Sequence, residues 1–424
     1  MRRGLAAFFL CVLGAAQELY DPMKPLSAET ILLARIRNVV SENLSRLPNF
    51  TCVQTIERSQ RLPGAKRYRF VDNIRLEVAL VEGKELYAWP GSPRFEEREL
   101  RDMVGGGAIG TGDFALHAKS IYLGDSARFT YQGTEMLRGR KVHVFHYRVP
   151  MASSRYMMRI EKAEGPVGYQ GHIYNDAETL EIARIELHID EVPPYLPLKE
   201  GHKAIDYAPM EIGGVRHVLP VSMEMTLVDL NGGENRNRTV FSGCKQYQGE
   251  SRLVFEDPPP EDTPPEAPVE WTLPEDLTVR LKLAEPLDLS RAAMGDPVVF
   301  EASRDAVRAG QAWLPRGARV TMRLDHVACR DFPVSHCFFA LVPVRFSFQN
   351  KSGEFRAELV QPDLGRSMEI LLRNVRPQLR TIPAEMGQAP REAAILLVSG
   401  RRARLPSGFE TVWRTLKSRG EQQP

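Results

Sequence analysis

The chain has 424 residues, 43% of them hydrophobic, and a formal net charge of +2. This length allows two or three domains, and the hydrophobic fraction is high enough for real cores. The near-neutral charge excludes a dedicated binder of nucleic acids or other polyanions, because neutralising phosphates requires a clear excess of basic residues.

The first 16 residues have the layout of a secretory signal peptide. An arginine pair is followed by an uninterrupted run of apolar or small residues at 4–16, and Gly14 and Ala16 precede a cut that would leave Gln17 as the first residue. The alternative, a transmembrane anchor, is disfavoured because the run is too short to cross a bilayer. We therefore expect a periplasmic or secreted protein that keeps no transmembrane segment once the signal is removed.

Four cysteines remain after the signal: Cys52, Cys244, Cys329 and Cys337. An even number in an exported chain predicts two disulfides, and three pairings are possible. The distribution of the cysteines favours Cys52 with Cys244, which closes the first domain, and Cys329 with Cys337, which closes a hairpin. In the loop-entropy model the long link contributes about 5 kcal/mol and the short one about 2.5 kcal/mol.

The mature part opens with a predicted helix from Ser27 to about Leu47. Apolar residues recur there at helical spacing, interrupted by Asn43. Pro48 and Asn49 end the pattern.

Short stretches with apolar residues in period two follow, at 74–78, 185–189 and 223–227, and a hairpin around 138–140 adds another. This period means that one face is buried and the other wet, and many such strands predict an antiparallel sheet. The glycine-rich residues 98–121 interrupt it, and we expect a loop and a short helix there. A nucleotide-binding loop is disfavoured, because the residue pattern after the glycines is unlike a phosphate cradle.

Residues 257–275 are rich in proline and acidic residues, so they predict a semi-stiff linker. This linker separates a first domain at 25–256 from a second at 276–415, with a tail at 416–424. Residues 277–283 alternate again, and further short strands follow. The second domain is therefore predicted to be a small all-β sandwich or barrel, and the whole chain to be mainly β with an α+β first domain.

Enzyme chemistry has no recognisable motif in this chain, which carries neither a nucleophile elbow nor a zinc-protease helix. We expect no catalytic residue and no cofactor. A hydrolase with scattered residues remains as an alternative, since catalytic groups need not be close in sequence.

A zinc site is a second alternative, at His326, Cys329, His336 and Cys337, whose ligand types fit that metal. Their spacing is unlike paired zinc knuckles, and thiols of an exported protein tend to oxidise. A disulfide is therefore favoured over a metal, and no metal site is expected.

Methionines crowd the second half of the first domain. Methionine suits adaptable apolar surfaces, although it also fills ordinary cores. The predicted apolar ligand face consists of Met157, Met223, Met225 and Leu227.

Two segments of the first domain carry a family resemblance. They read GHIYNDAETLEIARIELHIDEVP at 171–193 and IDYAPMEIGGVRHVLPVSMEM at 205–225. Their layout, after a signal and one long helix, resembles the LolA-type periplasmic lipoprotein carriers and their lipid-binding relatives. This resemblance implies an incomplete antiparallel barrel that wraps a helix and encloses an apolar cavity for acyl chains.

Two further resemblances concern other parts of the chain. The stretches NFTCVQTIER at 49–58 and FSGCKQYQGESRLVF at 241–255 are similar to uncharacterised exported proteins of soil bacteria, which implies that their two cysteines pair. The phrases GDPV at 295–298 and LPRGA at 314–318 resemble the C-terminal β-barrel of type IV secretion scaffold proteins, which implies an interaction role for the second domain.

The sequence thus predicts an exported envelope protein that binds an apolar ligand, either an acyl chain, a lipid or a lipoprotein, in the half-barrel of its first domain. The alternative is a non-catalytic structural or adaptor protein of the envelope with a filled core. Expected partners are the apolar ligand or a lipidated protein and an envelope protein, but no nucleic acid.

Overall fold

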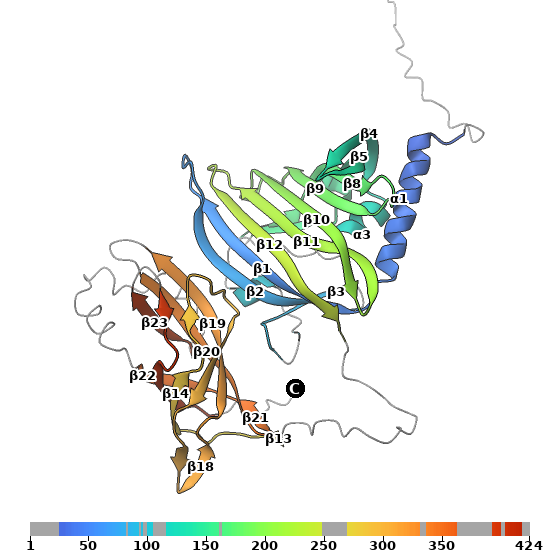
Figure 1. Cartoon of the computed structure of the whole chain (residues 1–424). Coiled ribbons are helices and arrows are strands. Elements are labelled where there is room, and N and C mark those ends of the chain that lie inside the picture. The colour runs from blue at the N-terminus through green and yellow to red at the C-terminus, as the bar shows by residue number, and fades with distance from the viewer. Residues whose placement is uncertain are drawn as a thin grey trace, which may run out of the picture.

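The computed structural model describes residues 25–81, 84–92, 95, 100–104, 116–160, 163–247, 269–330, 336–362, 392–399 and 403–417. The predicted signal peptide, most of the predicted linker and the end of the predicted tail lie outside the described residues. The described part is mainly β, as the alternating patterns predict, and it forms two large sheets (Figure 1).

The predicted N-terminal helix is present as α1 (Ala28–Ser45). It begins where the Ser27 side chain accepts a hydrogen bond from the Thr30 backbone N–H at 3.2 Å, which satisfies one of the free donors of the first turn. Ile36 and Val40 are buried. Two shorter helices are present, α2 (Leu100–Val104) within the segment 98–121 where a short helix was expected, and α3 (Leu116–Leu123), which begins in that segment and ends two residues beyond it. Residues 105–115, which hold most of the expected loop, lie outside the described residues.

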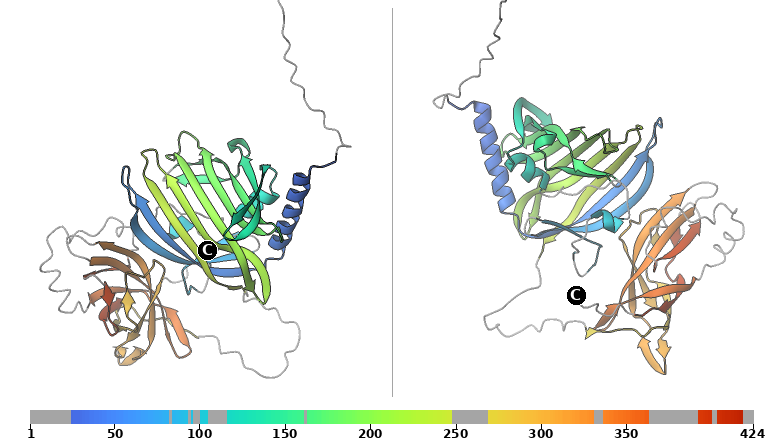
Figure 2. Two further views of the ribbon diagram at one scale, coloured as in Figure 1. Left: turned by 45° about the horizontal axis from the view of Figure 1, so that its top comes forward. Right: turned by 180° about the vertical axis from the view of Figure 1, so that it is seen from behind.

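The first sheet has ten strands, all paired antiparallel. Its spatial order is β3 (Lys84–Ala88), β2 (Arg69–Val81), β1 (Phe50–Arg61), β12 (Glu234–Gln246), β11 (Val215–Val228), β10 (Glu200–Ile212), β9 (Ile182–Glu191), β8 (Gly168–Asp176), β5 (Arg140–Val149) and β4 (Arg128–Leu137). The sheet curls, and α1 stands beside it (Figure 2). Strands β3 and β4 are the two ends of this order, so the curled sheet is an incomplete barrel, as predicted.

A turn (Met151–Ser153) and a small hairpin, β6 (Met157–Ile160) and β7 (Ala163–Pro166), lie between β5 and β8 in the chain.

Alternation along the strands gives this sheet two faces. On the helix face, apolar side chains such as Ile185, Leu187 and Ile189 pack into one core with α1 and α3. The opposite face, called the outer face below, carries the intervening residues, for example Glu186 and His188, which are only partly buried.

The second sheet has nine strands. They are β13 (Val269–Glu270), β21 (Lys351–Glu354), β20 (His336–Phe348), β19 (Arg319–Arg330), β16 (Pro297–Ala302), β14 (Thr278–Leu283), β25 (Glu410–Thr415) and β22 (Ala357–Pro362), with β23 (Ala394–Ser399) also paired to β20. Two small pairs accompany them, β15 (Leu287–Asp288) with β24 (Arg404–Leu405) and β17 (Ala306–Arg308) with β18 (Gln311–Leu314). Their shared core includes Phe300, Phe339 and the fully buried Trp413.

Both expected disulfides are present. Cys52 of β1 is bonded to Cys244 of β12, 192 positions further along the chain. The link therefore joins the strands that come first and last in the chain, which are neighbours in the ten-stranded sheet. Cys329 and Cys337 lie directly opposite each other on β19 and β20 and are also bonded. The four candidate zinc ligands are therefore not a set of free thiols and imidazoles.

The two sheets touch at the turn before β16. Met294 forms a parallel bridge with Ile74 of β2, where β2 extends beyond its partner β3. The Arg75 N–H donates to the Met294 carbonyl at 2.7 Å, and the Met294 N–H donates to the Asn73 carbonyl at 2.7 Å. The Met294 side chain is 2% exposed and packs with Ile74 and Leu76, so the turn completes a core of the first sheet.

Charged and aromatic contacts surround this turn. Arg75 forms an ion pair with Asp296, whose other carboxylate oxygen accepts the Ala293 N–H at 2.8 Å. The Arg323 guanidinium lies 4.7 Å from the centre of the Trp89 ring. Backbone, ionic and aromatic contacts thus hold the second sheet against β2.

Candidate functional site

The predicted apolar ligand face is only partly assembled. Met223, Met225 and Leu227 lie together on the helix face of β11, are buried, and belong to the core that α1 and α3 cover. Met157 lies apart from them, on the β6–β7 hairpin, with 50% of its surface exposed. Its neighbour Met158 points inward to that core instead. Successive residues of a strand face opposite ways, so only one of two adjacent methionines can join a given face.

Helix α1 covers this core incompletely. Leu32, Leu33, Val39 and Leu44 pack against it but stay partly exposed, whereas only Ile36 and Val40 are fully buried. The Arg37 guanidinium lies 5.1 Å from the centre of the Phe129 ring on the edge strand β4. The seam between α1 and the sheet therefore offers apolar surface that further contacts could bury.

Asn43 fixes the C-terminal end of α1 to the sheet. Its side-chain amide donates to the Val218 carbonyl at 3.1 Å and accepts the Val218 N–H at 3.3 Å. Val218 lies on the part of β11 that precedes its pairing with β12. The polar residue that interrupts the apolar stripe of the helix is thus the one that attaches the helix to a strand edge.

A buried basic pair lies on the helix face. Lys203 of β10 and His117 of α3 are 4% and 7% exposed, and the Lys203 Nζ is 2.9 Å from the His117 Nε2. The Tyr156 ring lies beside both side chains. Burial, helped by the positive charge of Lys203, holds the pKa of His117 well below its usual range. His117 is therefore neutral in the folded protein at neutral pH.

This depressed pKa predicts a loss of stability in mild acid. Unfolded histidine binds a proton below about pH 6.5 while folded His117 does not, so the free energy of unfolding falls as the pH drops below that value. The contribution is at most about 1.4 kcal/mol per pH unit for one such group. His117→Gln, which keeps a hydrogen-bonding side chain but does not titrate, should flatten the curve between pH 6.5 and 5. Urea unfolding at several pH values measures this, and identical slopes for both proteins would contradict it.

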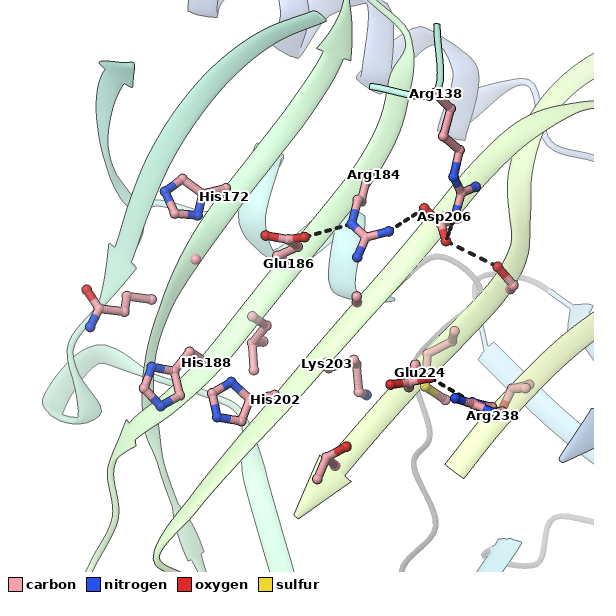
Figure 3. Close-up of a pocket in the computed structure, with 18 of the residues that line it drawn as sticks. Arg138, His172, Arg184, Glu186, His188, His202, Lys203, Asp206, Glu224 and Arg238 are labelled. Carbon is pink, nitrogen blue, oxygen red and sulfur yellow. Dashed lines mark hydrogen bonds and ion pairs between the residues drawn. The ribbon is translucent and has the colours of Figure 1, made fainter. Parts of the chain in front are cut away.

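The outer face carries a cavity of about 820 Å³, lined by side chains from β5 and from β8 to β12 (Figure 3). Charged residues pair inside it, both along β9 and between β9, β10 and the turn before β5. The Arg184 guanidinium forms ion pairs with the carboxylates of Glu186, at 2.8 Å, and Asp206, at 2.9 Å. The Arg138 guanidinium pairs with the other carboxylate oxygen of Asp206 at 2.7 Å. This part of the cavity is therefore polar, unlike the helix face on the other side of the sheet.

Four histidines stand on the outer face in cross-strand pairs. Strand register sets His146 opposite His172 on β5 and β8, and His188 opposite His202 on β9 and β10. The His188 and His202 rings are stacked, with centres 4.3 Å apart and planes 7° apart. Glu200 lies two residues before His202 on the same face, and its Oε2 is 3.6 Å from the His188 Nε2 and 3.9 Å from the His202 Nε2.

The alternating pattern correctly placed His188 on the solvent side of its strand but could not reveal its neighbours. His188 and His202 meet only because β9 and β10 pair in one register, in which His188 faces His202 and Ile185 faces Ile205. The sequence did hold one indication that the two histidines share a face. Both lie at polar positions of strands that follow each other in the chain, and such strands often pair.

No protein-family model matches the chain, and no curated protein matches it. Several solved structures show some similarity to the chain, at TM-scores of 0.30 or less. A putative outer membrane lipoprotein-sorting protein domain from Vibrio parahaemolyticus has a TM-score of 0.30 and 13% identity, with 52% of this chain and 95% of that chain covered. A LolA superfamily protein from Nitrosomonas europaea has a TM-score of 0.26 and 11% identity, covering 53% and 95%.

A third similar structure is ComB10 of the Com type IV secretion system of Helicobacter pylori, with a TM-score of 0.19, 9% identity, and 34% of this chain and 86% of that chain covered. Both kinds of protein that the sequence resembles are among the solved structures with some similarity to this chain. At such TM-scores none of these likenesses bears on what the chain binds. No helix among the described residues is long and apolar enough to span a membrane.

Proposed function

We propose that this chain is an exported envelope protein that binds an apolar ligand, either an acyl chain, a lipid or a lipoprotein, in the seam between α1 and the helix face of the ten-stranded sheet. The observation that carries this proposal is the incomplete burial of the α1 stripe. Leu32, Leu33, Val39 and Leu44 pack on an apolar core yet remain partly exposed. A ligand tail in the seam would bury them, and burying apolar surface is the main favourable term in such binding.

The attachment of α1 supports a seam that opens from one end. The bonds of Asn43 to Val218 hold the C-terminal end of the helix. Towards the other end, Leu26 and Ile31 are 67% and 49% exposed. The N-terminal half would therefore move away from the sheet to admit a ligand while the C-terminal half stays in place.

The disulfides support the proposed location. Both links are of the kind that forms and persists outside the reducing cytosol, in the periplasm or in secreted proteins. The role proposed is one of binding rather than catalysis.

Titration with a fluorescent fatty acid tests this function. Leu33→Glu places a charge in the seam, and burying an unpaired carboxylate beside an acyl chain is costly, so we expect binding at least tenfold weaker. Arg35→Glu introduces the same residue at an exposed position of the same helix and should bind as the native protein does. Equal dissociation constants for the two variants would count against the seam. Circular dichroism of both variants verifies that the helix is retained.

The second candidate is a structural or adaptor protein with a filled core. One observation favours it, namely that Met223, Met225 and Leu227 are already packed against other side chains. In that case the native protein would take up no fatty acid at all, which the same titration detects.

A further inference from the structure

We propose that His188, His202 and Glu200 bind one divalent transition-metal ion of the Zn²⁺ type at the outer face of the ten-stranded sheet. This site lies on the opposite face from the proposed apolar seam and does not depend on it. Its ligand atoms are the two imidazole Nε2 atoms and one carboxylate oxygen.

The geometry fits a small coordination sphere. One ligand atom from each of the three residues lies within 4.8 Å of those of the other two. Glu200 Oε2 lies 3.6 Å and 3.9 Å from the Nε2 atoms of His188 and His202. Zn²⁺ binds imidazole nitrogen and carboxylate oxygen at roughly 2.0–2.2 Å, which sets tetrahedral ligands a little over 3 Å apart. Because a metal lies near the plane of each imidazole that binds it, the stacked rings of His188 and His202 must tilt out of their parallel arrangement to bring both Nε2 atoms around one ion.

An independent observation comes from His188 itself. Its Nε2 is buried, and within the described part of the chain it has no hydrogen-bond partner. Buried polar atoms of this kind are rare, and an ion that the atom would coordinate is one of the recognised explanations. The atom that lacks a hydrogen bond is the one that the proposed site uses.

The backbone holds the ligands in place. His188 and His202 are directly opposed on paired strands, and Glu200 belongs to the same strand as His202. Ligands carried on strands are positioned more firmly than ligands on loops.

The ligand types select the metal class. Imidazole suits Zn²⁺, Cu²⁺ and Ni²⁺, whereas Mg²⁺ and Ca²⁺ prefer sites made of oxygen atoms alone. Three protein ligands leave a fourth position for water or for an oxygen of a bound molecule, and the adjoining cavity gives access to it.

Isothermal titration of the full mature chain with ZnCl₂ tests the proposal, using protein without a histidine tag that has been dialysed against a chelator. We expect one ion per chain. His202→Gln and Glu200→Gln should each weaken binding at least tenfold. The matched control is His146→Gln, which alters the other cross-strand histidine pair on the same face, and it should bind Zn²⁺ as the native protein does.

Co²⁺ provides a second readout, since its visible absorption reports how many ligands surround it and what they are. The native protein should give the spectrum of a low-coordinate nitrogen and oxygen site, and Glu200→Gln should change it. Absence of Zn²⁺ binding by the native chain would overturn the proposal, as would an equal loss in His146→Gln and His202→Gln. Thermal midpoints of the metal-free variants, expected within a few degrees of the native value, separate loss of a ligand from loss of folding.

Discussion

Replacing Cys52 and Cys244 with serine is expected to lower the free energy of unfolding by about 3–5 kcal/mol. The link joins residues 192 positions apart, so without it the unfolded chain regains a large amount of conformational freedom. It also joins β1 and β12, the first and last strands of this sheet in chain order, next to a register shift between Thr51 and Val53. Denaturant unfolding of the oxidised native protein and of the double variant measures the difference.

The second disulfide is a built-in control for this prediction. Cys329 and Cys337 close a loop of only 8 positions, so their replacement by serine should cost less, about 2.5 kcal/mol in the same model. Equal thermal midpoints in oxidising and reducing buffer would show that neither link contributes to stability.

Gly295→Ala is expected to separate the second sheet from the first. Gly295 has a φ of +100°, and an added Cβ would meet the Arg75 carbonyl oxygen and the Trp89 ring. The backbone strain alone costs about 1–3 kcal/mol, and the clash with the strand adds to it. The Met294 turn would then leave β2. Differential scanning calorimetry should resolve two transitions in place of one, and small-angle scattering should report a larger radius of gyration.

Gly310→Ala is the matched control for that change. Gly310 also has a positive φ, of +78°, but an added Cβ would meet nothing within 4 Å. It therefore carries the backbone strain without touching the contact between the sheets, and should keep the native radius of gyration. If Gly295→Ala keeps that radius too, the Met294 turn does not hold the sheets together.

Local patterns predicted the elements well, because they depend on residues close together in the chain. The apolar stripe predicted a helix from Ser27 to about Leu47, and α1 spans Ala28–Ser45. The alternation of Ile185, Leu187 and Ile189 correctly identified the buried face of β9. The export context led to disulfides at the four cysteines, and the structure contains both.

Features that depend on pairing between distant parts of the chain could not be predicted from local sequence patterns. The phase of the short β6 strand is ambiguous in sequence, because Met157 and Met158 are adjacent and either could face inward. The His188–His202 pair depends on register across two strands. The docking of Met294 depends on β3 being shorter than β2, which leaves an edge of β2 free.

Native mass spectrometry of the protein purified from its own cell envelope tests the central proposal, apolar ligand binding, most directly. We expect a population that carries the added mass of an acyl chain or lipid, and Leu33→Glu purified in the same way should lack it. A spectrum of ligand-free native protein, together with no uptake of a fluorescent fatty acid, would contradict the proposal and favour the structural role with a filled core.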